Sequence, residues 1–251
     1  MTGPRLSALI VAHNEEAELP ACLGSVSFAD EIVVVLDRCT DGSRSAVERF
    51  PAKIVEGAWE IEGPRRMAGI EACSGDWIFE IDADERVSAE LAAEIRERIA
   101  TAPAGYFLVP VDNYIGDRLV RHGWGASWGT AAKACLFSRG AKRWGDQRVH
   151  PRIDMSGERQ WLSKPIAHYV DRDISDMIAR LDRYTSARAK DLRASGEIGS
   201  FGPNLRRLFS RFYKCYVRRK GYREGGYGFL IALFAGLYPL LSFLKAKLER
   251  E

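Results

Sequence analysis

The first hundred residues alternate short apolar runs with amphipathic segments, and this alternation limits the fold more than any other feature. Strands are expected at "LSALIVA" (Leu6 to Ala12), "EIVVVL", "AKIVE" and "DWIFEI". Helices are expected between them, after Asn14, from about Asp41 and at "GPRRMAGIEACS", and Ser88 is expected to cap a fourth, "AELAAEIRERIA". Strand and helix in alternation predict an α/β fold of parallel βαβ units with helices on both faces of the sheet.

Beyond residue 104 the alternation becomes less regular. Strands of mixed pairing are expected at "GYFLVPVDNYIG", "AAKACLFS" and "KPIAHYV", and the pattern turns helical from Ser175. A chain of 251 residues with 46% hydrophobic content can bury one large core. We therefore expect one domain over residues 1–200, with halves 1–104 and 105–200, followed by a helical C-terminal segment over residues 201–251.

Charge and cysteine content exclude several classes of protein. A net charge of +3 is too small to imply nucleic acid as a partner. The five cysteines are scattered and show no CxxC spacing, which argues against a disulfide framework or a zinc site. The N-terminal "MTGPRLSALIVAHNEE" does not resemble a secretory signal. We expect a protein of the reducing cytoplasm.

Polar residues come directly after three of the expected strands: "AHNEE" after the first, "DRCTD" after the second and "DADE" after the fourth. Ligands of open α/β sheets bind at the carboxyl ends of the strands. Carboxylates gathered there suit Mg²⁺ or Mn²⁺, which share their coordination with substrate phosphates. The pattern therefore predicts a metal that holds a diphosphate. The alternative is that "DADER" is a solvated turn before the helix that Ser88 caps.

Three of these stretches, "LIVAHNEEAELPACLGSV", "EIVVVLDRCTDGS" and "GDWIFEIDADE", resemble the nucleotide-binding half of family 2 glycosyltransferases. The later pieces "CLFSRG", "RVHP", "GE", "IAHYV" and "LDRYTSARA" are similar to the subfamily that includes lipopolysaccharide-core glucosyltransferases. The resemblance implies the GT-A fold, with a mixed, mostly parallel sheet flanked by helices. It also implies an inverting enzyme that uses Mg²⁺ or Mn²⁺. Such an enzyme moves a sugar from a nucleotide-sugar donor, here expected to be a UDP-sugar, to a hydroxyl of a glycan or lipid-linked acceptor in cell-envelope synthesis.

The resemblance implies site residues position by position. The implied nucleotide pocket begins at Ala12, His13, Asn14 and Glu15. Asp37 would meet the uracil or ribose, Asp82 the ribose and metal region with Ala83 beside it, and Asp84 the divalent ion. Arg65 and Arg66 occupy positions where family members carry a basic or polar residue facing the nucleotide, although two exposed helix arginines would show the same pattern.

The general base is the open position in this assignment. Related chains read "VHE" where this one reads "VHP", so a glutamate that could serve as base is absent at Pro151. Asp146 is the preferred substitute, and Asp154 and Glu158 stay open as alternatives. His150 is expected to take part in catalysis, as a ligand of the metal or of the acceptor.

Other aromatic and histidine residues are interpreted more plainly. His122 and His168 are expected to be structural. Trp124, Trp128 and Trp144 are candidates for stacking against a sugar ring, although tryptophans in a globular chain need no such role.

The residues directly after the first strand exclude two competing functions. "AHNEEAEL" has neither the Gly-rich phosphate loop of a nucleotidyltransferase nor the GxGxxG of a Rossmann dehydrogenase. Two alternatives stay open: a catalytically inactive GT-A-like protein that binds membranes, and a polyprenyl-phosphate glycosyltransferase.

The C-terminal segment combines bases with apolar residues. "RRLFSRFYKCYVRRKGYR" (206–223) carries eight Lys or Arg and no acid. This pattern is typical of a surface that meets anionic lipid. The uncharged run 225–244 is just long enough to cross a membrane, but four glycines and Pro239 weaken that interpretation. We expect peripheral association with the inner face of the cytoplasmic membrane; the alternative is a pair of helices packed on the catalytic domain.

Overall fold

The computed structural model describes residues 3–125, 128–146 and 152–249. It divides into two compact units: residues 1–111 with 132–168, and residues 112–131 with 169–251. The chain passes from one unit to the other within strands β6 (Gly105–Ile115) and β12 (Ile166–Asp171). The domain limits expected from the sequence, at residues 104 and 200, stay a prediction.

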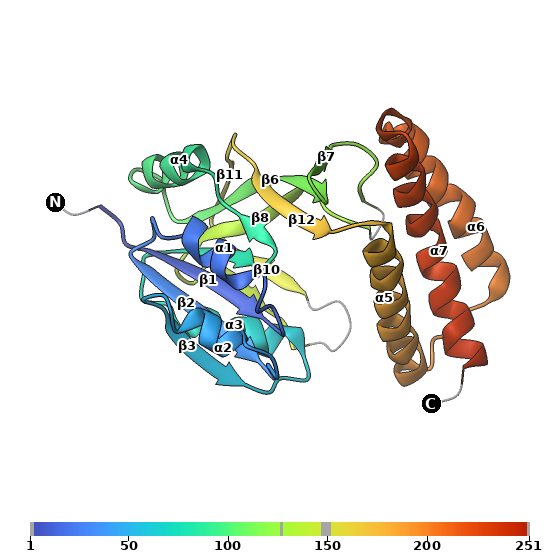
Figure 1. Cartoon of the computed structure of the whole chain (residues 1–251), viewed down its shortest axis with the longest axis horizontal. Coiled ribbons are helices and arrows are strands. Elements are labelled where there is room, and N and C mark those ends of the chain that lie inside the picture. Colours follow the sequence, from blue (N-terminus) through green and yellow to red (C-terminus); the bar gives the residue numbers. More distant parts are fainter. Residues whose placement is uncertain (1–2, 126–127, 147–151, 250–251) are drawn as a thin grey trace. The chain divides into compact units, whose positions relative to one another are not determined.

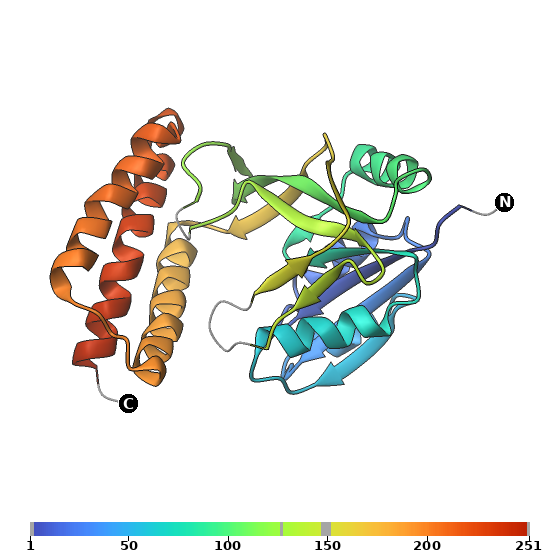
Figure 2. The ribbon, with the colours of Figure 1, turned by 180° about the vertical axis from the view of Figure 1, so that it is seen from behind.

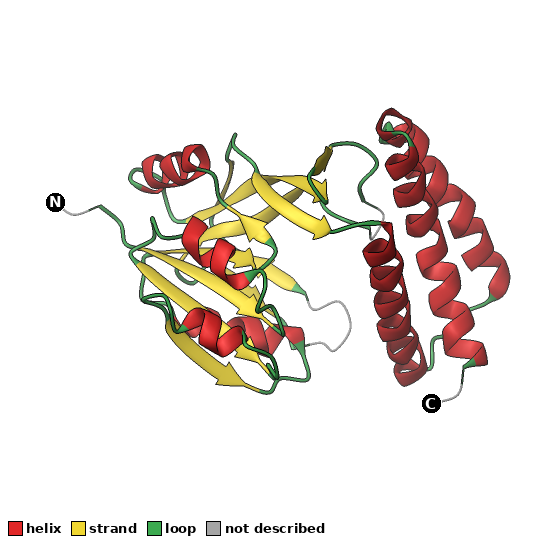
Figure 3. Ribbon diagram, in the orientation of Figure 1, coloured by secondary structure: helices red, strands yellow, loops and turns green. Residues whose placement is uncertain are grey.

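The first unit is built on a mixed sheet (Figure 3). Its parallel part has the order β3 (Lys53–Gly57), β2 (Glu31–Asp37), β1 (Leu6–Ala12), β4 (Trp77–Asp82). Antiparallel strands β8 (Ala132–Ser138) and β6 continue it, followed by β12 and β5 (Glu85–Arg86). The predicted α/β fold, a mixed sheet flanked by helices, is confirmed.

Helices cover both faces of the parallel strands. α1 (Leu19–Ser25) and α2 (Ser43–Val47) lie on one face (Figure 1), and α3 (Glu62–Ala72) lies on the other (Figure 2). All seven residues of β1 are buried, because its side chains alternate between the two layers. Ser88 caps α4 (Ala89–Ile99) as predicted: its Oγ accepts a hydrogen bond of 3.2 Å from the backbone N–H of Leu91.

Several short strands are not expected from the sequence pattern. β11 (Glu158–Trp161) pairs with β6, β7 (Arg118–Val120) pairs with the end of β6, and β9 (Lys142–Trp144) pairs with β10 (Ile153–Met155). Strands of three or four residues are too short to show a period of two. β11 is defined by long-range pairing, whereas β7 forms a tight hairpin with β6 in which Ile115 is aligned with Arg118.

The second unit is mainly helical. Its elements are α5 (Ile174–Ser195), α6 (Phe201–Tyr213), the π-helical turn η1 (Lys214–Arg218), the 3₁₀ turn η2 (Gly221–Glu224) and α7 (Gly226–Leu248). Both α5 and α6 pack against α7. The core of this unit contains Trp124 and Trp128, which are 6% and 0% exposed. The prediction that these two tryptophans stack on a sugar is therefore wrong, because protein covers both rings.

Candidate functional site

The carboxyl ends of β1, β2 and β4 meet at one edge of the first unit's sheet. The register aligns Ala12 with Leu36 and Val11 with Asp82, so the segments after these strands start side by side. The expected site residues at the ends of β1, β2 and β4 therefore gather at one place, as the sequence predicts for an open α/β sheet.

Asp37, at the end of β2, is almost fully buried and saturated with hydrogen bonds. Oδ1 accepts from Arg38 Nε and from the backbone N–H of Trp59, both at 3.0 Å. Oδ2 accepts from Arg38 at 3.0 Å and from Arg65 at 3.1 Å. Burial opposes ionisation, but these hydrogen bonds outweigh it and hold the pKa of Asp37 below its usual value. Since about four lone-pair positions are in use, a nucleobase N–H reaches this carboxylate only if the half-exposed Arg38 side chain moves.

The segment after β1 is held by hydrogen bonds to the segment after β2. His13 Nδ1 lies 2.6 Å from the carbonyl oxygen of Asp37. Asn14 has a left-handed φ of 57°, and its Oδ1 accepts from the backbone N–H of Thr40 at 2.8 Å. Partial burial, followed by the nearby carboxylates of Asp84 and Glu18, raises the pKa of Glu15 to about 7. The acidic side chains around Glu15 therefore carry more negative charge than nearby cations neutralise.

The acidic turn after β4 contains two carboxylates that share one lysine. Lys133 Nζ, on β8, lies 2.6 Å from Asp82 Oδ2 and 2.8 and 2.9 Å from the two oxygens of Glu85. Arg66 binds the other oxygen of Asp82 at 3.0 Å. Glu85 is 1% exposed and also accepts from the backbone N–H of Asp82 at 2.9 Å. The turn is therefore not a solvated loop: two of its three acids are bound to internal cations.

The third acid of the turn, Asp84, contacts a histidine instead. His168 Nε2, on β12, lies 3.2 Å from Asp84 Oδ2. Burial lowers the pKa of His168, but the hydrogen bond to Asp84 and the charges of Asp84 and Glu85 outweigh it, so the pKa is raised overall. The register of β12 with β5, which aligns His168 with Glu85, creates this contact. His168, expected from the sequence to be structural, thus lies at the aspartate that the resemblance assigns to the metal.

Arg65 and Arg66 both face acids of this edge from α3. Arg66 is largely buried between Glu80, at 2.9 Å, and Asp82. The Arg65 Nε–H is buried and has no hydrogen-bond partner within the described residues. The interpretation of both as plain exposed helix arginines is therefore wrong.

A hollow of about 300 Å³ lies beside Asp82 in the first unit. Its walls are mostly charged: Arg66, Glu80, Asp82, Lys133 and Lys142 line it with Ala134, Cys135, Trp144 and Ile153. Arg66 and Lys142 approach the ring of Trp144 to 5.4 and 5.0 Å from its centroid. Trp144, the last of the three candidates for sugar stacking, therefore already makes cation–π contacts with Arg66 and Lys142.

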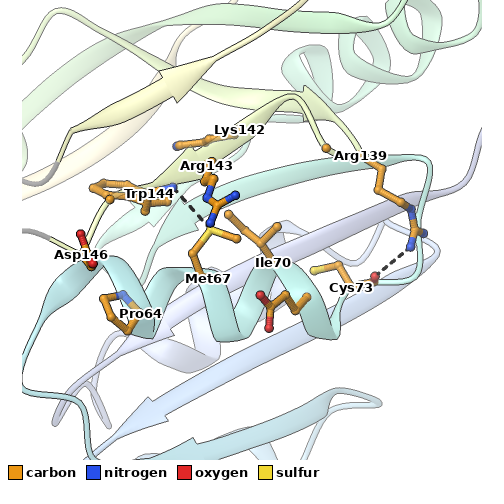
Figure 4. A pocket seen from close by; sticks show the side chains of 12 residues that line it. Pro64, Met67, Ile70, Cys73, Arg139, Lys142, Arg143, Trp144 and Asp146 are labelled. Atoms are coloured by element: carbon orange, nitrogen blue, oxygen red, sulfur yellow. Dashed lines mark hydrogen bonds between the residues drawn. The ribbon is translucent and has the colours of Figure 1, made fainter.

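Asp146 lies at the same edge of the sheet as the acidic turn. The first turn of α3 comes after the carboxyl end of β3, and a Cβ at Gly63 in that turn would meet the Gly145 carbonyl oxygen at 1.8 Å. Asp146 is exposed and belongs to a second hollow of about 590 Å³ along α3. Figure 4 shows Asp146 and Pro64 at one end of this hollow and Arg139 at the other.

The other candidate bases differ in position. The pairing of β11 with β6 aligns Glu158 with Gly105. The register continues from β6 through β8 to Trp77, the first residue of β4. Glu158 thus lies at the opposite edge from Asp82, and its candidacy as base is wrong on this geometry. Asp154 is paired with Arg152 at 2.6 Å on the exposed surface. His150 lies outside the described residues.

The acidic residues after the parallel strands thus lie where open α/β sheets bind their ligands. The model of the family "Glycosyl transferase family 2" matches residues 7–212. The chain belongs to this family and is a glycosyltransferase.

The chain is also similar to individual proteins. It is 26% identical over 254 residues to the "Lipopolysaccharide core biosynthesis glycosyltransferase LpsC" of Rhizobium meliloti (strain 1021), across 96% of this chain and 91% of that protein. It is 25% identical to an uncharacterized glycosyltransferase of Rickettsia felis, across 98% and 90%. A solved structure of glucosyl-3-phosphoglycerate synthase from Mycobacterium tuberculosis matches 45% of each chain at 22% identity with a TM-score of 0.38, which supports no conclusion about this chain.

Proposed function

We propose that this family 2 glycosyltransferase moves a sugar from a UDP-sugar to a hydroxyl of a glycan or lipid-linked acceptor, with inversion at the anomeric carbon. The observation that carries the proposal is the Asp82–Ala83–Asp84 turn at the carboxyl edge of β4, next to the segments that hold Glu15 and Asp37. The similarity to a protein named for lipopolysaccharide core biosynthesis supports an acceptor in that core or in another cell-envelope glycan.

The donor set at Asp84 fits Mg²⁺ or Mn²⁺. Its carboxylate and the His168 imidazole are 3.2 Å apart. Within the described ranges no group of three or more His, Cys, Asp or Glu could hold a metal. Ions of this kind take one or two carboxylates from the protein and complete their coordination with phosphates, water and few other protein groups. We propose Asp84 and His168 as the protein ligands in the described part of the chain, and His150 stays a predicted ligand. The bound ion would stabilise charge on the departing diphosphate.

The remaining residues would bind and orient the substrates. Asp37 and the segment from Ala12 to Asn14 would hold the nucleoside, and the Arg65 Nε–H offers an unused donor to it within the described structure. Asp146 would take the proton of the acceptor hydroxyl, because it is exposed at the edge that carries the acidic turn. The attack then comes from the face opposite the diphosphate, which gives inversion.

The test is Mn²⁺-dependent binding and slow hydrolysis of a panel of nucleotide sugars by the purified protein. UDP-sugars should bind only with Mn²⁺ or Mg²⁺, and Asp84→Asn should abolish this binding and hydrolysis. Glu97→Gln, an exposed acid on α4, is the matched control and should behave as wild type.

The acceptor and the stereochemistry need a second assay. Transfer to acceptors with a free hydroxyl should give a product whose anomeric configuration, read by NMR, is opposite to that of the donor. If no nucleotide sugar binds in the presence of Mn²⁺, the result supports the alternative of an inactive GT-A-like protein. If the only acceptor is polyprenyl phosphate, the result supports the alternative of a polyprenyl-phosphate glycosyltransferase.

We also propose that the enzyme works peripherally at the inner face of the cytoplasmic membrane. A lipid-linked acceptor would present its sugar there, and the basic segment 206–223 supports contact with anionic lipid.

A further inference from the structure

The surface of the second unit formed by α6, η1 and η2 combines exposed bases with exposed apolar side chains. We refer to the exposed residues between Arg206 and Arg223 as the basic-aromatic face. Four apolar or aromatic side chains of this face are exposed: Phe209 by 65%, Tyr213 by 57%, Val217 by 42% and Tyr222 by 51%. The exposed bases beside them include Arg206, Lys214, Arg218, Lys220 and Arg223. Large apolar side chains kept in water on one face mark an interaction site.

The order of these residues along the helix gives the face two adjacent stripes. Phe209, Tyr213 and Val217 succeed one another at intervals of four residues, so they lie along one line of α6 and η1. Lys214 and Arg218 have the same spacing one position further on, and so form the neighbouring line. The stripes place positive charge next to apolar side chains along the length of the helix, as in helices that lie in a membrane interface.

The helix that could cross a membrane by length and composition is α7, and the structure gives it a different role. From Leu230 to Ala246 no residue of α7 is exposed. At Gly236 a Cβ would meet the Leu208 carbonyl oxygen of α6 at 2.6 Å, so the two backbones are in close contact. Lys245 Nζ, on α7, lies 2.5 Å from Asp182 Oδ1 of α5. α7 is therefore the middle helix of this unit, packed between α5 and α6 (Figure 1).

Aromatic packing holds the basic-aromatic face on α7. Phe212 stacks on Tyr216 with 5.3 Å between ring centroids, and Phe229, at the start of α7, meets Phe212 edge-on at 5.6 Å. The face is thus a fixed part of the unit. Its outward side chains need no refolding to reach a partner.

We propose that the basic-aromatic face docks on an anionic lipid surface while α7 stays inside the protein. Phe209, Tyr213 and Val217 would enter the headgroup layer, and the bases would meet lipid phosphates. This proposal rests on the peripheral association proposed above and deepens it, because it names the docking residues and excludes a membrane span. It does not depend on the chemistry of transfer. Lipid is favoured over nucleic acid because the apolar residues lie along a helix and not in a groove that could track a strand.

Cosedimentation with vesicles tests the proposal on the full-length protein. It should pellet with vesicles that contain phosphatidylglycerol, not with pure phosphatidylcholine, and high salt should release it. Lys214→Glu with Arg218→Glu should weaken partitioning by more than ~30-fold, because each lost base contributes a factor of ~5 and the anionic surface also repels the two new carboxylates. Arg183→Glu with Lys190→Glu, two exposed bases of α5, is the matched control with the same change of charge and should stay near wild type.

A second pair of variants separates apolar insertion from charge. Phe209→Ser with Tyr213→Ser should weaken partitioning by ~10-fold at unchanged charge, whereas Trp161→Ser, an exposed tryptophan of the first unit, should not. Thermal unfolding and UDP-sugar hydrolysis should stay normal in all variants. If the glutamate pair does not fold, Lys214→Gln with Arg218→Gln replaces it, with an expected loss of ~30-fold.

The proposal is overturned by any of four results: equal binding to neutral and anionic vesicles, indifference to the Lys214 and Arg218 variants, retention in the bilayer after alkaline carbonate, or binding to nucleic acid with none to vesicles. Each result leaves Mn²⁺-dependent hydrolysis untouched. A failure of docking is therefore distinguishable from a failure of the proposed function.

Discussion

Lys133 is the residue whose replacement tests the account of the acidic turn most directly. Its ammonium is shared by Asp82, at 2.6 Å, and by Glu85, at 2.8 and 2.9 Å. Lys133→Met removes the cation and leaves both carboxylates. Breaking a buried ion pair in this way costs about 3–5 kcal/mol. Arg66 still binds Asp82, and the Asp82 N–H still binds Glu85, so we expect the lower end, about 3 kcal/mol.

The assay is thermal and denaturant unfolding with a double-mutant cycle. For a chain of this size a loss of about 3 kcal/mol lowers Tm by about 6–12 °C. Lys133→Met should cost at least about 1 kcal/mol less in a Glu85→Gln background, because the neutral amide no longer needs the lysine. Lys164→Met, an exposed lysine of the same unit, should stay within about 0.5 kcal/mol of wild type.

One outcome would refute this reasoning. Suppose that Lys133→Met has the same Tm as the Lys164→Met control, and that the losses of stability from the changes at Lys133 and Glu85 are additive. Lys133 then does not stabilise the turn. Mn²⁺-dependent UDP binding, measured on the same variants, then shows whether the geometry of Asp84 depends on Lys133 at all.

Three further predictions concern the site. Asp146→Asn should lower turnover by ~10²-fold or more while UDP-sugar binding persists, since loss of a general base acts on the chemical step; near-normal turnover would move the role to His150 or Asp154. Arg38→Ala should leave UDP-sugar affinity within about twofold or improve it, because it frees two acceptor positions on Asp37, whereas tenfold weaker binding would contradict that view. The raised pKa of Glu15 favours its neutral form in the folded state, so the free energy of unfolding without metal should fall as pH rises from about 4.5 to about 7; urea titrations of Glu15→Gln should lose this fall.

The first half of the fold could be predicted because its signals are local. β1, β2 and β4 are short runs of mostly apolar residues, and their alternation with the intervening helices predicts a parallel α/β sheet. The cap at Ser88 also depends on a few adjacent residues. These local signals are enough to predict that Asp37, Asp82 and Asp84 lie at one edge of the sheet, because no contact between distant segments is needed for the prediction.

The partners of the acids could not be predicted in the same way. Lys133 is separated by 51 residues from Asp82, and His168 by 84 from Asp84. Both reach the turn only through the pairing of β8 with β4 and of β12 with β5. One signal was present: a lysine inside the apolar run "AAKACLFS" needs a buried acid opposite it. The short strand β11, which removes Glu158 from the site, gave no signal at all.

The position of α7 between α5 and α6 has a consequence for the order in which this protein acquires its structure. α5 and α6 precede α7 in the chain, yet Met177 and Leu181 on α5 belong to a core that is completed by Ile231, Ala232, Phe234 and Ala235 of α7. During synthesis the sheet can fold from local βαβ units, while the helical unit waits for its last helix. The nascent chain therefore passes through a stage in which a completed catalytic sheet carries two helices with open apolar faces. That stage is the one at which we expect chaperones to bind it.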